Sequence, residues 1–380
     1  MDESFGYHRY LGHTFFDKFE LFETALACRD FSPAIEFVFP NADALGNCTI
    51  EPEAALTDLY RARARSLREK HDYLILMYSG GADSNQVLMT FLRNGIFLDE
   101  VRTCYPMRFI ERLPAAATPD DPLALMHEYR LATVPGLRLV HALSPRTRIN
   151  VVDNTDAFLG DMTEWTQALP GPRISGGPHG LYGGVKKVRE GIDLQRHADA
   201  LNRKVGVIFG VEKPYLRLIG DDLYFFFADA GRLGIEHCWQ HGNQLNYRPI
   251  MFYWGDPVIT LKQAHIIKRV LQNSPAALAD IRKRGVNVYL TNDIPGVNLS
   301  LIYPDWDWRY QQRDKQRNEA ILPAFLGPRV DGIAAERTRF YNGKYGRLAG
   351  VSRLTDRPPR VGLTDTLTRL YHLGSLNEAG

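Results

Sequence analysis

One segment limits the possible folds of this chain more than any other: an apolar run that ends in a glycine pair. The run is Tyr73–Tyr78, and Ser79-Gly80-Gly81 follows it directly. Six such residues in a row predict a strand buried on both faces, which is typical of a parallel sheet. From Asp83 the apolar residues return at helical spacing until Asn94-Gly95, a common helix end. The segment therefore predicts a strand, a loop and a helix.

The remaining pattern predicts more elements of the same kind. Helical spacing is found over 51–70, 123–133 and 258–271. Apolar runs predict strands at Phe97–Val101 (reaching Cys104-Tyr105-Pro106), Leu137–Val140 and Val205–Gly210, and a hairpin of Leu216–Ile219 with Leu223–Phe227. Strands that alternate with helices form parallel sheets covered by helices. We therefore expect an α/β fold with a Rossmann-like parallel-sheet core.

The length of the chain suggests more than one structural unit. At 380 residues it exceeds an average domain. We expect an N-terminal extension and helix over 1–70, an α/β domain over 71–270, and a helical or irregular C-terminal appendage over 271–380. Residues 309–360 hold twelve Lys and Arg against five Asp and Glu, a difference of seven positive charges. This basic stretch is a candidate contact for nucleic acid.

Composition excludes several classes of protein. The four cysteines are scattered without a CxxC pair, which argues against a disulfide scaffold and a zinc ribbon. A net charge of +2 gives no overall field that would attract nucleic acid or a membrane. The acidic start lacks the apolar stretch of a signal peptide, and no run approaches the ~20 apolar residues of a membrane span. We expect a soluble, cytoplasmic protein without membrane contact.

The loop after the apolar run has the composition of an anion-binding site. It consists of Ser79, Gly80, Gly81, Ala82, Asp83 and Ser84. The glycines let backbone N–H groups approach an anion, and the helix that follows points its positive end there. The two serines add hydroxyl donors. A carboxylate repels phosphate, so we expect Asp83 to hold Mg²⁺ against phosphate oxygens. The alternative is a purely structural turn with Asp83 as the helix N-cap.

The sequence SGGADS resembles the SGGxDS signature of the PP-loop ATP pyrophosphatase superfamily, whose fold is adenine nucleotide α-hydrolase-like. It matches neither GxxxxGK[ST] nor GxGxxG. The resemblance covers about residues 70–270, and the chain is similar to uncharacterised phage-encoded members. It implies that ATP is bound, with adenine near Met77, Tyr78 and Cys104-Tyr105. Most members adenylate a carboxylate or carbonyl oxygen, and a nucleophile then displaces AMP.

Two lysines are further candidates for stabilising the charge of the departing pyrophosphate. Lys213 lies in Gly210–Pro214, at the end of a predicted strand, where parallel sheets bind ligands. Its neighbour Glu212 is a candidate ligand for a metal or a substrate amine; the alternative is an ordinary charged turn. Lys186 ends the glycine-rich stretch 175–187, together with Lys187, and we predict either a lid over the triphosphate or a surface connection.

Two aromatic clusters allow other interpretations. Glu236–His241 places His and Cys at a spacing close to that of zinc ligands, although packed histidines without metal explain the pattern better. Asp305–Tyr310 alternates aromatic and charged residues, which suits either base stacking beside the basic stretch or a core or subunit interface. A homodimer is therefore one of the expected assemblies.

Absent features separate the possible activities. Asp2 stands where an N-terminal glutaminase would carry its cysteine, and no CxxC pair is present to bind a cluster or relay sulfur. We expect an ATP-dependent, AMP-forming enzyme of the ligase or amidotransferase type, acting on a small-molecule or nucleic-acid-linked acceptor with an amine, ammonia or sulfide. The alternatives are a phosphoadenylylsulfate reductase-like protein, whose C-terminal cysteine motif is missing, and a non-catalytic nucleotide- or nucleic-acid-binding module.

Overall fold

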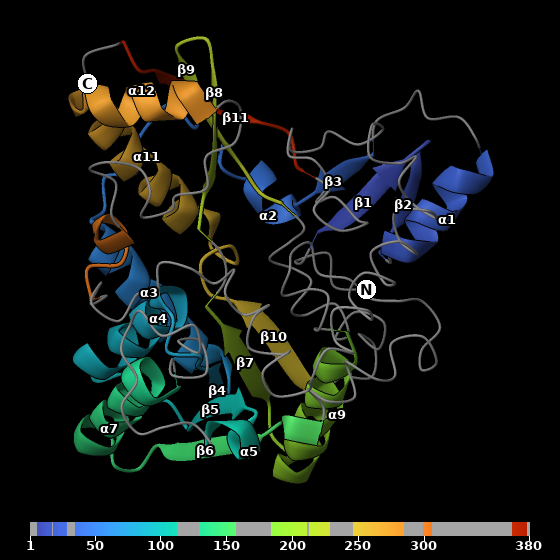
Figure 1. Cartoon of the computed structure of the whole chain (residues 1–380), viewed down its shortest axis with the longest axis vertical. Helices are drawn as coiled ribbons and strands as arrows, with labels where there is room; N and C mark the ends of the chain where they lie inside the picture. The colour runs from blue at the N-terminus through green and yellow to red at the C-terminus, as the bar shows by residue number, and fades with distance from the viewer. Residues whose placement is uncertain are drawn as a thin grey trace.

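A five-stranded sheet, parallel throughout, forms the centre of the molecule (Figure 1). The computed structural model describes residues 6–16, 18–28, 35–111, 129–156, 184–210, 213–228, 246–284, 299–305 and 367–377. Across the sheet the strands are β10 (Tyr247–Met251), β7 (Val205–Phe209), β4 (Tyr73–Met77), β5 (Glu100–Tyr105) and β6 (Arg148–Asp153). The chain enters at the central strand β4, continues to β5 and β6, and then crosses to β7. The strand order therefore reverses between β4 and β7.

Helices cover both faces of this sheet. Figure 1 shows α3 (Leu56–Lys70), α4 (Ala82–Arg93) and α7 (Val134–Leu143) on one side and α9 (Gly184–Leu201) on the other. Buried residues follow helical spacing in α3, at Leu56, Tyr60, Ala64 and Leu67. In β4 the three central residues, Leu74–Leu76, are completely buried, as the continuous apolar run predicts. The α/β core with a parallel sheet is therefore confirmed.

One predicted strand is wrong. Leu137–Val140 lies in helix α7, and the third strand is β6, further along the chain. A proline in the first turn favours the helix, and only one side of α7 is buried, at Gly136, Leu137 and Val140. Short apolar runs fit a helix or a strand equally well. Strand β6 was missed because it is the last strand of the sheet and none of its residues is buried.

The other predicted elements of the core shift only at their ends. The second strand begins at Glu100 and not at Phe97, and the helix predicted over 51–70 begins at Leu56. The helix predicted over 258–271 is α11 (Pro257–Asn273). Of the helix predicted over 123–133, the described part is the π-helical turn η2 (Tyr129–Thr133), which leads into α7. Short helical segments are α5 (Met107–Ile110), α12 (Pro275–Arg284) and η5 (Leu299–Leu301).

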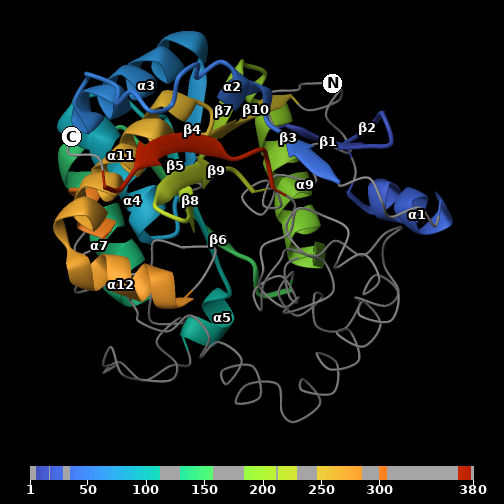
Figure 2. The ribbon, with the colours of Figure 1, turned by 90° about the horizontal axis from the view of Figure 1, so that it is seen from above.

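The predicted hairpin is confirmed, and it belongs to a second sheet. Strands β8 (Tyr215–Ile219) and β9 (Asp222–Phe226) pair antiparallel, and β9 also pairs with β11 (Tyr371–Ser375) near the end of the chain. Figure 2 shows β11 lying beside β9 above α11. A third sheet consists of β1 (Tyr7–Tyr10), β2 (His13–Phe15) and β3 (Glu36–Val38), with α1 (Lys18–Cys28) and α2 (Pro40–Asp43) nearby in sequence.

Aromatic side chains join these parts into one core. The ring of Phe227, just after β9, lies 5.2 Å from Trp254 and 5.0 Å from Phe39. A hydrogen bond from the amide of Phe37 to the carbonyl of Leu367 (3.1 Å) links β3 to the C-terminal segment. Residues distant in sequence therefore share one buried cluster. Within the described residues, no helix is long and apolar enough to cross a membrane.

Candidate functional site

The glycine loop connects the carboxyl end of β4 to α4, next to the point where the strand order reverses. Gly80 has a φ of +81°, a conformation that side chains disfavour. A Cβ there would also lie 2.6 Å from Thr133 Oγ1. Gly81, with a φ of −70°, is the N-cap of α4. The backbone at Gly80 therefore requires glycine, both for its conformation and for its close approach to Thr133.

The two serines of the loop bond to each other. Their hydroxyl oxygens are 3.2 Å apart, and the amide of Gly81 donates to Ser79 Oγ at 3.3 Å. Ser84 Oγ accepts from the amide of Ser79 and donates to the carbonyl of Gly81, both at 3.2 Å. Ser84 and Ala82 are buried, whereas Ser79 is exposed. The hydroxyls thus fix the shape of the loop and leave backbone N–H groups of the first helical turn to meet an anion.

Asp83 is the second residue of α4 and makes no capping bond, so the alternative of an N-cap at Asp83 is wrong. Its carboxylate instead joins two distant residues. Lys213 Nζ lies 3.2 Å from Oδ2, and the hydroxyl of Tyr303 donates to Oδ1 at 2.6 Å. The hydroxyl of Tyr253 donates to the carbonyl oxygen of Asp83 at 2.7 Å. The structure therefore brings together two residues that the sequence singled out, Asp83 and Lys213.

Tyr303 was missed by the sequence analysis. Burial, and then the negative charge of Asp83, raise the pKa of Tyr303 well above its ordinary value, so it stays a neutral donor. The segment that carries it is anchored on α4 through Asp305, which accepts from Gln86 Nε2 at 3.1 Å and pairs with Arg93. The predicted pattern weakens from Ile302 onward, and no local motif marks Tyr303.

Gly210, directly after β7, lies against the first turn of α4. A Cβ on Gly210 would lie 2.8 Å from both the Cα and the amide nitrogen of Ser84. Backbone atoms cannot yield as a flexible side chain can, so only glycine lets the end of β7 approach the first turn of α4 so closely. The chain then continues to Lys213, which is half-buried against Asp83.

The residues expected near adenine differ in their burial and in their contacts with the loop. The Tyr105 hydroxyl donates to the carbonyl of Ser79 at 2.5 Å, and Thr133 Oγ1 donates to the same carbonyl at 2.9 Å. Tyr78 is buried: its hydroxyl donates to Asn85 Oδ1 at 3.2 Å. Met77 ends β4 and is partly buried. Tyr105 is therefore a brace of the loop, a role that its sequence position alone did not reveal.

Several predicted features lie outside the described residues or differ from expectation. Lys186 and Lys187, expected at the end of a loop, lie in α9, which begins at Gly184; the side chains of 184–192 are not described. Outside the described residues lie the proposed lid 175–183, Glu212, Glu236–His241, 306–310 and the basic stretch 309–360.

Comparison with protein-family models finds no match, and comparison with curated proteins finds none either. Within the described ranges, no three side chains of His, Cys, Asp or Glu form a group that could hold a metal ion. Among the described residues, a metal at Asp83 would thus be held by this carboxylate together with ligand oxygens. Mg²⁺ is commonly held in this way, by one or two carboxylates and substrate phosphates.

Proposed function

We propose that this chain binds ATP at the loop 79–84 and adenylates a carboxylate or carbonyl oxygen of an acceptor, with release of pyrophosphate. An amine, ammonia or sulfide then displaces AMP. The proposal includes membership of the PP-loop superfamily, to which SGGADS points. The observation that carries it is the contact between Lys213 and Asp83, 3.2 Å apart, beside the glycine loop and at the reversal of strand order.

The location supports a ligand site on general grounds. Open parallel sheets bind ligands outside the carboxyl ends of their strands, where the order reverses. Here the strands on the two sides of that point, β4 and β7, lead into the glycine loop and toward Lys213. The helix α4 starts at the same place, and its N-terminus favours negative charge. Phosphate groups are thus the ligands that this location suits.

The bonds that change follow from the proposed chemistry. An acceptor oxygen attacks the α-phosphorus, the bond from that phosphorus to the bridging oxygen of the β-phosphate breaks, and pyrophosphate leaves with the electron pair. Lys213 moves from Asp83 to the leaving oxygens and offsets their charge. The catalysis consists of positioning and electrostatics, and no side-chain nucleophile is needed.

Asp83 is the residue that would hold magnesium. Its two oxygens contact Lys213 and Tyr303, so release of Lys213 to the phosphates frees one oxygen for the ion. The ion would supply positive charge that shields the phosphate oxygens from one another. Tyr303, bonded to the other oxygen, keeps the carboxylate oriented.

The decisive experiment follows ATP labelled in the α-phosphate, with Mg²⁺ and the small-molecule fraction of a cell extract as the source of acceptor. We expect labelled AMP and free pyrophosphate, and no activity in Asp83→Asn. Lys213→Ala should lower turnover roughly 100-fold, whereas Lys283→Ala, an exposed lysine on α12, should not. Formation of ADP would contradict cleavage at the α-phosphate. Tight ATP binding without turnover under any acceptor supply would instead support the non-catalytic alternative.

A further inference from the structure

A cavity of about 290 Å³ lies between helix α3 and strand β10, and the glycine loop contributes nothing to it. It reaches the amino ends of β4 and β7, where His71 and Lys204 precede the strands. The loop 79–84 follows the opposite, carboxyl end of β4. The size is at the low end of the range of small-molecule sites, about 300–1,000 Å³. The cavity is therefore a second candidate site, separate from the first.

The walls of this cavity carry positive charge and no negative charge. Four of the lining residues are cationic and none is acidic: Arg63, Lys70, Lys204 and Arg248 line it. No carboxylate in the described part of the chain forms an ion pair with Lys70 or Lys204. Like charges gathered around a small space repel one another, and an anion between them would remove that cost.

Arg63 shows that this charge is held in place. Its guanidinium lies close to the carbonyl oxygens of Phe252 (3.3 Å) and Met251 (3.4 Å), and a Cβ on Gly255 would lie 2.3 Å from it. The nearby carboxylate of Asp256 attracts it electrostatically but is not among the lining residues. Arg63 is thus a fixed wall of the cavity, whereas Lys204 and Arg248 are exposed cations at its margin.

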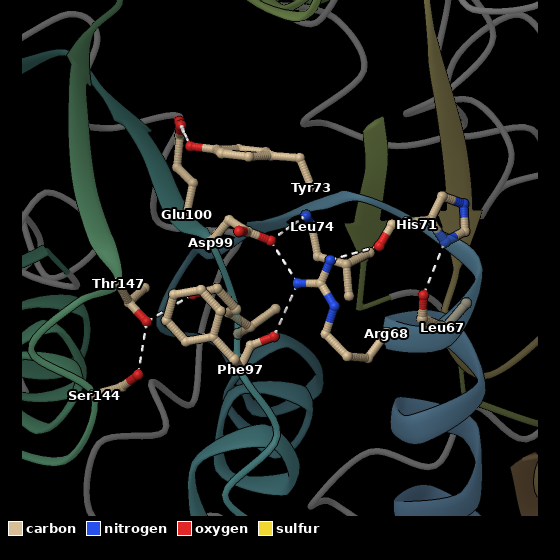
Figure 3. Close-up of polar contacts among 11 residues, drawn as sticks. Leu67, Arg68, His71, Tyr73, Leu74, Phe97, Asp99, Glu100, Ser144 and Thr147 are labelled. Atoms are coloured by element: carbon tan, nitrogen blue, oxygen red, sulfur yellow. Dashed lines mark hydrogen bonds and ion pairs between the residues drawn. The ribbon is translucent and has the colours of Figure 1, made fainter. Parts of the chain in front are cut away.

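His71 provides a different polar atom. The residue is buried, with 6% of its surface exposed. Nδ1 lies 2.9 Å from the carbonyl of Leu67, so Nδ1 carries the proton and the other nitrogen, Nε2, has a free lone pair. Among the described residues, no hydrogen-bond partner reaches Nε2. Figure 3 shows Nδ1 turned toward Leu67 and the other ring nitrogen pointing away from α3.

The orientation of His71 is fixed from two sides. Arg68 donates to the carbonyl of His71 at 2.5 Å and also pairs with Asp99 at 2.5 Å (Figure 3). A Cβ on Gly206 would lie 2.8 Å from the ring of His71, so the ring packs directly on the backbone of β7. The ring of this lining residue is therefore held in place, and Nε2 cannot simply rotate away to find water.

We propose that this cavity binds the phosphate group of a small phosphorylated molecule. A phosphate monoester offers several acceptor oxygens to the cations, and near its second pKa of about 6 it also carries one O–H. That O–H can donate to His71 Nε2, which completes the hydrogen bonding of the buried ring. The narrow volume favours a small molecule over a nucleic-acid backbone. The proposal does not depend on ATP binding at the glycine loop.

The charges around His71 determine the pKa of its ring, and a bound phosphate would change it. Burial first, and then the cations Lys204 (directly before β7), Arg248 (in β10) and Arg68 (in α3), lower the pKa of His71. A bound phosphate adds negative charge beside the ring and acts in the opposite direction. His71 is therefore an internal reporter: binding in this cavity raises its pKa, and binding at the distant loop does not.

The test uses the full chain with ¹³C-labelled histidine and inorganic phosphate as the probe. The ring signal of His71, assigned by its loss in His71→Gln, is titrated with pH in phosphate and in chloride at equal ionic strength. We expect phosphate to raise the pKa of His71 by roughly half a unit or more. The double variant Lys204→Ala/Arg248→Ala should abolish this shift. Arg203→Ala, which removes an adjacent exposed charge outside the cavity, should preserve it.

Calorimetry provides a second reading that does not depend on the histidine signal. The double variant should bind inorganic phosphate at least about tenfold more weakly than the unchanged chain. An unchanged His71 titration in phosphate would overturn the proposal, as would an equal shift in the double variant. Failure here leaves AMP formation from ATP untouched, and failure of ATP turnover leaves the His71 titration untouched, so the two outcomes can be told apart.

Discussion

The two ends of the central sheet differ in how their charged side chains are arranged. At the carboxyl end, Asp83 and Lys213 neutralise each other beside two glycines, and backbone amides are the main donors. At the amino end, cationic side chains surround a cavity without a lining carboxylate, and His71 keeps a free lone pair. The first arrangement can exchange its internal ion pair for a ligand. The second has no carboxylate in its lining, and an anion that enters it would meet cations from several elements.

This difference separates the tasks of the two ends. A reacting site profits from a lysine that can move from a carboxylate to a developing charge, because the interaction then strengthens during the reaction. A cavity lined by cations and a buried ring offers an anion several contacts without a reacting group, which suits recognition.

Gly80→Ala should damage the carboxyl end most. The new Cβ meets Thr133 at 2.6 Å in a backbone conformation with a φ of +81°, so we expect a loss of roughly 3 kcal/mol in the free energy of unfolding, together with ATP binding. Gly95→Ala is the control, because its φ of +61° is similarly strained but nothing lies within 4 Å. Equal losses in both variants, measured by denaturant unfolding, would show that the contact with Thr133 is unimportant.

Arg68→Ala should destabilise the amino end. Arg68 bonds Asp99 and the carbonyls of Phe97 and His71 in a partly buried setting (Figure 3), so its loss should cost about 2 kcal/mol. The control is Arg61→Ala, whose pair with Asp58 has a similar 2.5 Å distance but is exposed, and should cost about 0.5 kcal/mol or less. Similar costs for both variants would mean that Arg68 does not organise the end of the sheet.

Acid should weaken the fold through two histidines. Burial lowers the pKa of His71 and of His265 in the folded chain, so their contribution is complete above the unfolded value of about 6.5 and is lost as pH falls through the folded pKa. Each contributes a slope of up to about 1.4 kcal/mol per pH unit below pH 6.5. His71→Gln should reduce the slope of the free energy of unfolding against pH. Phosphate should reduce this slope in the unchanged chain and should have no such effect in His71→Gln.

The control is the difference in the free energy of unfolding between the unchanged chain and His71→Gln at each pH. Asp256, whose pKa burial raises, acts in the opposite direction and is present in both, so it cancels in the difference. Unfolding by urea between pH 5 and 7 gives the measurement. A slope in His71→Gln as steep as in the unchanged chain would show that His71 is not neutral in the folded state.

Tyr303→Phe should have the smallest effect, about 1 kcal/mol in stability, because it removes one hydrogen bond to Asp83 Oδ1. It should also raise the Mg²⁺ concentration that supports half-maximal ATP turnover. Tyr253→Phe is the matched control, since its hydroxyl bonds the backbone carbonyl of the same residue. It should cost similar stability without changing the Mg²⁺ requirement. Identical Mg²⁺ titrations for both variants would contradict the role given to Tyr303.

The sequence was most informative where structure is local. Strand β4, the glycine loop and helix α4 are contiguous, and each one's pattern agrees with the next, so their order and ends were predictable. The error at Leu137–Val140 arose because β6 lies at the end of the sheet and lacks an apolar run, whereas the neighbouring helix has one. Edge strands carry a weaker hydrophobic signal than central ones.

The contacts that complete the two sites are not local, and this is why the sequence could not reveal them. Tyr303 reaches Asp83 across 220 positions of the chain. Lys213 was a candidate only because it follows a predicted strand, and its partner Asp83 lies 130 positions earlier in the chain. Nothing in the sequence around His71 shows that Arg248 lines the same cavity.

Amide hydrogen exchange with and without ATP and Mg²⁺ reports which end of the sheet binds the nucleotide. We predict slower exchange in peptides that cover 79–85 and 205–213, and no change in peptides that cover α3 through His71. Slower exchange confined to α3 and β10, with the glycine loop unchanged, would contradict the assignment of ATP to the loop.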